Sequence, residues 1–177
     1  ARNEPHTWAL VEQGRYAIGT IDSYLIARMS RGTWHITDVS NASRTLLFDL
    51  EKGEWSPELC ALFGVPMDAL PEVAASWGEL AKSDPASFLG LDLPISGIAG
   101  DQQAALFGQT CFEEGESKCT YGTGSFILTN TGTTMQRSDK GLLSTAAWQA
   151  PGSKVTYALE GTIYVTDAAV QWLRDGI

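Results

Sequence analysis

Long apolar runs and clusters of basic residues are what this sequence of 177 residues lacks. Because it shows neither a long apolar run nor a signal-peptide pattern, we expect a cytoplasmic protein that does not enter a membrane. Lysine and arginine number 12 against 21 aspartates and glutamates, which leaves a net charge of −9. This balance argues against binding to nucleic acid or to anionic membrane surfaces. An anionic ligand would have to be held by backbone N–H groups and a metal ion.

Cysteine and histidine are scarce. The three cysteines, Cys60, Cys111 and Cys119, are odd in number and form no Cys-x-x-Cys pair, which argues against a disulfide framework or a zinc site. We expect each thiol to serve as a small buried apolar group. The two histidines, His6 and His35, have no partner at a metal-binding or catalytic spacing. The sequence therefore predicts no metal site made by the protein alone.

The common phosphate-binding motifs are also missing, since no Gly-x-x-x-x-Gly-Lys-Ser/Thr loop occurs. Two glycine-containing segments stand out instead: residues 97–108 read GIAGDQQAALFG and residues 120–126 read TYGTGSF. In the first, an apolar strand is expected to pass into a helix at Asp101. A carboxylate there faces the crevice in which α/β sheets bind ligands, and it can accept the proton of a hydroxyl that attacks phosphorus. The alternative is that Asp101 is simply the helix N-cap.

The second segment predicts a tight hairpin turn at Gly122-Thr123-Gly124. Two glycines let backbone N–H groups converge on an anion, and Thr123 adds a hydroxyl; the alternative is an ordinary hairpin turn. Gln102 and Gln103 can hydrogen-bond a polyol, or can be solvated residues on the helix surface. Gln171 can reach into a cleft, although exposure on a helix surface is the default expectation.

The remaining pattern predicts a mixed α/β chain with a boundary near residue 109. Ser56 and Pro57 begin a helix that runs to Gly64, and the proline-containing stretch 64–90 is expected to be mostly loops and short turns. The other expected elements are a polar connection at 38–43, a buried strand at 93–99, a helix from 101 to 108, strands at 118–121, 125–130, 142–149 and 155–159, a turn at 160–161, and a helix at 164–174.

Taken together and in order, the motifs resemble one known family. Besides 97–108 and 120–126, the matching segments are 19–26, 41–48, 70–73, 130–132, 157–161 and 171–175. Nearly the whole chain resembles the FGGY carbohydrate kinase family, and residues 100–108 are similar to its glycerol-phosphorylating branch. The resemblance implies two ribonuclease-H-like domains of the actin/hexokinase type with the active site between them. Residues 1–108 would then end the first domain, which carries the glycerol side, and residues 109–177 would begin the nucleotide domain.

The resemblance also implies roles for individual residues. Asp101 matches the family's catalytic base and glycerol ligand, Gln102 a glycerol contact, and Phe126 an apolar neighbour of the glycerol carbons. The nucleotide side would comprise Gly122, Thr123, Gly124, Asp167 and Gln171. The implied reaction is phosphorylation of glycerol by ATP with Mg²⁺, giving sn-glycerol 3-phosphate. The full-length protein is expected to be a homo-oligomer, and this segment is expected to be inactive by itself because other parts of the family's site lie outside it.

Two departures from the family pattern bear on function. Asp167 stands where the family usually has glycine near the nucleotide phosphates, and a carboxylate there would repel them unless it points away or meets Mg²⁺. Asp92 stands where bacterial members inhibited by fructose 1,6-bisphosphate tend to have arginine, so this inhibition is not expected. The alternatives that remain are a kinase of another polyol or sugar, and a non-catalytic relic that has lost nucleotide binding.

Overall fold

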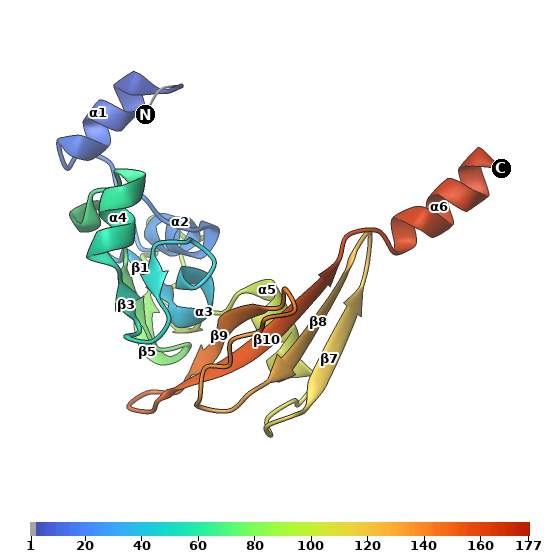
Figure 1. Ribbon diagram of the computed structural model, residues 1–177. Coiled ribbons are helices and arrows are strands. Elements are labelled where there is room, and N and C mark those ends of the chain that lie inside the picture. Colours follow the sequence, from blue (N-terminus) through green and yellow to red (C-terminus); the bar gives the residue numbers. More distant parts are fainter. Residues whose placement is uncertain (1–2) are drawn as a thin grey trace. The chain divides into compact units, whose positions relative to one another are not determined.

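The computed structural model describes residues 3–177 and consists of two compact units that divide between Ile98 and Ala99 (Figure 1). Each unit has its own packed core. We predict the boundary between the family's two domains at residues 108 and 109, which is a statement about the full-length protein and stays a prediction.

The first unit consists of helices around short two-stranded sheets. Strands β1 and β4 pair in parallel, whereas β2 with β3 and β5 with β6 pair antiparallel. Ile26, Ile36 and Ile98 form one of its core clusters. The elements, in chain order, are α1 (Pro5–Glu12), α2 (Ile21–Met29), β1 (Ile36–Asp38), α3 (Val39–Ala42), β2 (Phe48–Asp49), β3 (Glu54–Trp55), α4 (Pro57–Phe63), the 3-10 helix η1 (Met67–Ala69), β4 (Glu72–Ala74), β5 (Trp77–Lys82) and β6 (Pro94–Gly97).

Helix α4 forms as its sequence predicts. The Ser56 side chain accepts a hydrogen bond from the backbone N–H of Leu59, Pro57 occupies the first turn, and Gly64 ends the helix in the left-handed conformation with φ 66°. These are the N-cap, the first-turn proline and the C-terminal glycine that favour a helix of this length. The prediction is therefore confirmed.

Two expectations in this unit were wrong. Residues 38–43 contain a helical turn, α3, because the buried Asp38 carboxylate accepts the backbone N–H of Asn41 at 3.0 Å and so caps it. The stretch 64–90 is mostly loops and turns, as expected, and it also contains β4 and β5, which are stabilised by pairing with β1 and β6. Strand β6 was expected to be buried, but its residues are exposed or half-buried, and the core begins at Ile98. Within residues 3–177 it pairs with β5 alone, in a two-stranded sheet.

Acidification is expected to destabilise the first unit through His35. Burial lowers the pKa of its half-buried imidazole below the ordinary value, more strongly than a backbone hydrogen bond with Ile18 raises it. The unfolded state therefore binds the proton more readily, so the free energy of unfolding falls as the pH drops through about 6.5 and levels off below the folded-state pKa. Urea unfolding of His35→Gln between about pH 7.5 and 5 should show a weaker pH dependence. His6→Gln, at an exposed site, is the control; equal slopes in His35→Gln and the unsubstituted chain would contradict this account.

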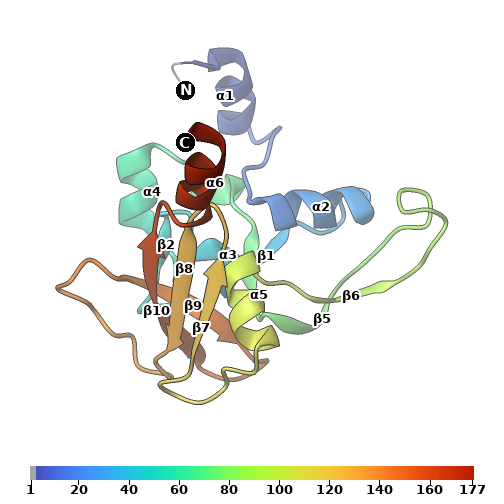
Figure 2. The same ribbon diagram turned by 90° about the vertical axis from the view of Figure 1, so that its right-hand side faces the viewer.

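The second unit is one antiparallel sheet with a helix packed on it and a helix at its end (Figure 2). The strand order is β7-β8-β10-β9, and α5 contacts β7, β8 and β9. Leu106 of α5 and Leu128 of β8 are fully buried at the centre of the core cluster. The elements are α5 (Asp101–Gly108), β7 (Ser117–Tyr121), β8 (Ser125–Asn130), β9 (Leu143–Gln149), β10 (Val155–Ile163) and α6 (Asp167–Gly176).

Most of the second unit agrees with the sequence-based prediction. The helix from 101 to 108 and the hairpin around 122–124 are confirmed, as are the strands that follow. The expected turn at 160–161 was wrong: both residues continue β10, where Glu160 pairs with Leu128 of β8 and is only 2% exposed. Pairing with β8, in which Gly161 lies opposite Ile127, extends the strand past a glycine that by itself suggests a turn.

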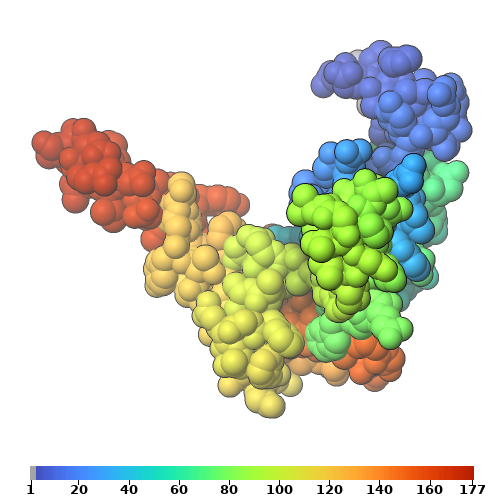
Figure 3. All heavy atoms as spheres, turned by 180° about the vertical axis from the view of Figure 1, so that it is seen from behind, coloured from blue at the N-terminus to red at the C-terminus, as the bar shows by residue number. Residues whose placement is uncertain are grey.

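Helix α6 stands apart from the core of its own unit. Figure 3 shows its atoms, in red, projecting from the sheet, and none of its residues is buried. Val170, Trp172 and Leu173 are each more than half exposed. Among residues 3–177, no helix combines the length and apolar character needed to cross a bilayer.

Candidate active site

Asp101 is the first residue of α5, and its side chain is exposed. Gly100 is the N-cap, with φ −63° and ψ 150°, and no side chain caps the helix. The alternative that Asp101 acts as the N-cap was therefore wrong. A carboxylate in the first helical turn is nevertheless favoured by the helix macrodipole. Asp101 is thus an accessible acid at the point where the chain enters the helix.

The side chain next to Asp101 connects it to the sheet. Nε2 of Gln102 donates a hydrogen bond to Oδ2 of Asp101 at 3.0 Å. Oε1 of the same amide accepts a hydrogen bond from Nζ of Lys118, on β7. Nζ of Lys118 also donates to Oγ1 of Thr120 at 2.8 Å and to the carbonyl oxygen of Phe126 at 3.3 Å. A continuous chain of polar contacts therefore runs from the first turn of α5 into the β7–β8 hairpin.

This chain of contacts brings Asp101 towards the turn of that hairpin. Thr120 pairs with Phe126, and the next pair, Tyr121 with Ser125, encloses residues 122–124. Two residues of a strand span about 7 Å, so the contacts of Lys118 end close to the turn. Asp101, Gln102, Phe126 and the turn all lie within the second unit and near one end of the hairpin.

The turn is fastened to the start of α6. The carbonyl oxygens of Gly122 and Thr123 accept the backbone N–H groups of Asp167 and Thr166 at 3.0 and 2.9 Å. The hydroxyls of Ser125 and Thr166 are hydrogen-bonded at 2.9 Å. These bonds use carbonyl oxygens of the turn, so an anion would have to be met by other atoms. They also place Asp167 directly beside Gly122-Thr123-Gly124.

Gly124 is required by the closeness of this contact. A Cβ at this position would lie 2.6 Å from the carbonyl oxygen of Ile163 and 3.2 Å from that of Tyr164. A Cβ on Gly122 would meet nothing closer than 3.5 Å. The second glycine of the turn is therefore the one that allows the hairpin and the chain before α6 to touch.

The remaining predicted residues differ in their surroundings. Phe126 is half-buried and packs against the core cluster of the second unit. Gln171 is exposed on α6. Gln103, for which solvent exposure was the default expectation, is buried and donates from Nε2 to Oγ1 of Thr145 at 3.0 Å.

Sequence reasoning missed Lys118 and Glu160, which are both 2% exposed. Burial lowers the pKa of the Lys118 ammonium, while the carboxylates of Asp101 and Glu160 and the thiols of Cys119 and Cys111 oppose this by raising it. The predicted hairpin could have indicated that Lys118 is buried, because its pairing sets Lys118 opposite Leu128 and Thr120 opposite Phe126. Because paired residues share a face of the sheet, the apolar Leu128 and Phe126 indicate that Lys118 points to the core side.

No group of three His, Cys, Asp or Glu side chains lies close enough to hold a metal ion in the part of the chain that is described. Mg²⁺ is commonly held by one or two carboxylates together with substrate phosphates, and it keeps several waters. Two carboxylates near the turn, those of Asp101 and Asp167, fit this pattern, in which protein carboxylates supply one or two of the ligands and the nucleotide phosphates supply others. A magnesium ion would accordingly arrive with the nucleotide.

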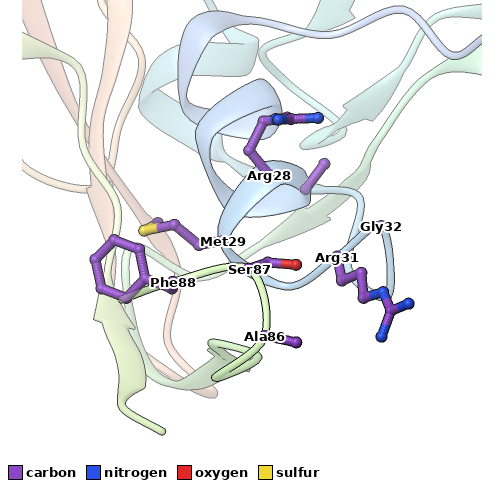
Figure 4. A pocket seen from close by; sticks show the side chains of 8 residues that line it. Arg28, Met29, Arg31, Gly32, Ala86, Ser87 and Phe88 are labelled. Carbon is purple, nitrogen blue, oxygen red and sulfur yellow. The ribbon is translucent and has the colours of Figure 1, made fainter. Parts of the chain in front are cut away.

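A hollow on the first unit, about 690 Å³ in volume, contains none of the predicted site residues (Figure 4). The guanidinium groups of Arg28 and Arg31 point in different directions in Figure 4 and do not converge on one point. The residues that line it are Ala27, Arg28, Met29, Arg31, Gly32, Ala86, Ser87 and Phe88. It therefore offers no focused anion site.

A sequence model described as the FGGY family of carbohydrate kinases, N-terminal domain, matches residues 1–108. The chain belongs to the FGGY family of carbohydrate kinases. It is 55% identical over 166 residues to glycerol kinase from Thermus thermophilus, covering 94% of this chain and 33% of the relative. It is 49% identical over 176 residues to glycerol kinase from Bdellovibrio bacteriovorus, covering 99% of this chain and 36% of the relative. The chain thus spans about a third of the length of the curated relatives it matches.

Solved structures agree with this assignment. The crystal structure of Plasmodium falciparum glycerol kinase with ADP matches with a TM-score of 0.90 and 39% identity, over 97% of this chain and 34% of that one. A xylulose kinase from Rhodospirillum rubrum matches with a TM-score of 0.78 at 23% identity, over 96% of this chain and 34% of that one, which shows the shared fold. The predicted family and the predicted α/β fold of the actin/hexokinase type are confirmed.

Proposed function

We propose that the full-length protein that carries this chain transfers the γ-phosphoryl group of MgATP to glycerol. In the proposed step, a glycerol hydroxyl oxygen attacks the γ-phosphorus and the bond from that phosphorus to the bridging oxygen of ADP breaks. The hydroxyl proton passes to the carboxylate of Asp101. The observation that carries this proposal is the position of Asp101, accessible at the start of α5 and tied through Gln102 and Lys118 to the hairpin.

The substrate side of the site would consist of three side chains. Asp101 would accept a hydroxyl, Gln102 would use the second N–H of its amide for another hydroxyl, and Phe126 would pack against the carbons. The Oδ2 atom of Asp101 is already hydrogen-bonded to Gln102, so the proton would go to Oδ1. Likeness to glycerol kinases over nearly the whole chain supports glycerol over another polyol or sugar.

The nucleotide side would consist of the turn at Gly122, Thr123 and Gly124 together with the adjacent helix α6. Asp167 and Gln171 lie on that helix, one helical turn apart. Mg²⁺ would enter as MgATP and neutralise charge on the transferring phosphoryl group, which is its general part in such reactions. The chain's own contribution is to place the turn, through the contacts of Gly122 and Thr123 with α6.

The wider setting of the protein is part of this proposal. Residues 1–108 would end the first domain of the kinase and residues 109–177 would begin the second. We propose a homo-oligomer located in the cytoplasm that binds neither nucleic acid nor membranes. The net charge of −9 and the lack of basic clusters in this chain support the absence of binding to nucleic acid and membranes.

The proposal is tested by measuring ADP release by the full-length protein with glycerol as the substrate, and separately with erythritol and with xylulose. A preference for glycerol is expected. Calorimetry with MgATP separates the relic alternative, because a protein that has lost nucleotide binding gives no binding heat and no turnover with any polyol. Either that result or a strong preference for xylulose would contradict the proposal.

Replacing Asp167 with asparagine is expected to lower the KM for MgATP by several-fold. The substitution removes one like charge beside the phosphates, worth on the order of 1 kcal/mol at a hydrated surface, while keeping the size of the side chain. The gain should shrink as the ionic strength rises. Asp175→Asn, near the other end of α6, is the matched control. A higher KM in Asp167→Asn would instead make this carboxylate a partner of the magnesium ion, and an unchanged KM would mean that it points away from the phosphates; either result would contradict the expected repulsion.

A further inference from the structure

Among the lysines and arginines of residues 3–177, Lys118 is the one that is buried, at 2% exposed. It lies on β7 opposite Leu128 and faces α5, on the side of the sheet that holds the core. Lysines are almost never buried to this degree unless they are paired. A buried ammonium here calls for an explanation beyond packing, since an apolar side chain would fill the same space without the cost of desolvation.

The three partners of Lys118 account for its three N–H donors. Nζ donates to Oε1 of Gln102, to Oγ1 of Thr120 and to the carbonyl oxygen of Phe126. An ammonium group has three donors and no acceptor. The group is therefore held in one place, and two of its partners are fixed by the hairpin.

The ammonium determines which way the amide of Gln102 faces. A lysine can only donate, and an ionised carboxylate can only accept. Between Lys118 and Asp101, the amide therefore has a single orientation that satisfies both neighbours, with Oε1 towards Nζ and Nε2 towards Oδ2 of Asp101. The donors and acceptors of the two neighbours therefore assign the oxygen and the nitrogen of this amide.

We propose that Lys118 is a positioning residue for the phosphoryl-transfer step, which locks the amide of Gln102 and through it the carboxylate of Asp101. This rests on the function proposed above. The exposed carboxylate of Asp101 would otherwise sample several rotamers at the start of α5. With Oδ2 held by the amide, Oδ1 is presented to the substrate hydroxyl in one arrangement, and misplacement of a reacting group by about 1 Å can cost about 100-fold in rate.

The surrounding charges are consistent with this role. Asp101 on α5, Glu160 on β10, Cys119 on β7 and Cys111 after α5 all act on Lys118 in the direction that favours its charged form. Burial acts in the opposite direction and is the largest influence on its pKa, which it lowers.

The test is a double-mutant cycle in the full-length kinase with Lys118→Met and Gln102→Leu. Lys118→Met alone is expected to lower kcat for glycerol phosphorylation by about 10- to 100-fold, with the KM for MgATP unchanged. In the Gln102→Leu background, the same substitution should change kcat less than about twofold, because the side chain through which Lys118 acts is already gone. Lys154→Met, at an exposed lysine before β10, is the matched control and should keep full activity.

An equal loss of kcat in both backgrounds, or full activity in Lys118→Met, would overturn the proposal. If Lys118→Met does not fold, as judged by circular dichroism, Gln102→Glu decides the question. It keeps a partner for Lys118 but has no N–H to give to Asp101, so kcat should fall while the protein stays folded. A fully active Gln102→Glu would likewise overturn the proposal. Asp101→Asn separates this inference from the proposed function. If Asp101→Asn retains turnover, the assignment of Asp101 as the base is wrong. If Asp101→Asn is inactive while Lys118→Met is fully active, only the positioning role of Lys118 is wrong.

Discussion

Asp101→Asn is expected to lower kcat for glycerol phosphorylation by about 10²- to 10⁴-fold, the usual contribution of a positioned general base. The substituted amide keeps the size of the side chain and an oxygen that can accept the hydrogen bond from Gln102, so the start of α5 should be unchanged. It cannot take the proton of the attacking hydroxyl. The KM for glycerol should change much less, since one hydroxyl contact is altered and none is removed.

The measurement is steady-state kinetics of the full-length protein, with ADP release as the signal. Asp139→Asn is the matched control: this aspartate belongs to the same unit, is highly exposed and forms an ion pair with its neighbour Lys140. It should keep normal turnover. Near-normal turnover in Asp101→Asn would remove the base from the proposed mechanism.

Gly124→Ala is expected to disturb both folding and nucleotide use. The added Cβ would lie 2.6 Å from the carbonyl oxygen of Ile163, and a backbone atom cannot give way as a flexible side chain can. We expect the free energy of unfolding to fall by about 1–3 kcal/mol, as for other overpacked sites. Because the hairpin and the start of α6 must separate, kcat/KM for MgATP should fall by about 10²-fold.

Two glycines serve as controls for the stability measurement. Gly122→Ala lies in the same turn but would make only an ordinary contact at 3.5 Å, and Gly108→Ala in α5 would meet nothing within 4 Å. Urea unfolding should therefore show a clear loss for Gly124→Ala and little change for the other two. If the three substitutions change the free energy of unfolding equally, Gly124 is not needed for the close contact between the turn and the chain before α6.

The elements that could be predicted are those whose signals are local. Helix α4 follows from its cap, proline and terminal glycine, and the β7–β8 hairpin from its glycine turn between two strand-like runs. Strands β4 and β5 could not be predicted in the same way. They are short, lie in a stretch with several prolines, and are stabilised by partners distant in sequence, as in the pairing of Ile36 with Glu72.

The candidate site was predicted unevenly for the same reason. Asp101 and the turn at 122–124 are visible as motifs, and the structure brings them to one end of a hairpin. Lys118 carries no motif, because a lysine in a strand usually faces solvent. Only the tertiary structure identifies Lys118, because its ammonium group donates hydrogen bonds to Gln102, Thr120 and Phe126.

The order of residues alone was enough to determine the family, the type of fold and the acid at the start of α5, since all of these depend on short segments of contiguous chain. Tertiary structure decided which polar side chains are buried, which glycine tolerates no Cβ, and how Asp101 is held. These depend on contacts between residues far apart in sequence, such as Lys118 with Gln102 and Gly124 with Ile163. No local pattern records such contacts, because they come into being only when the sheet and its helices pack together.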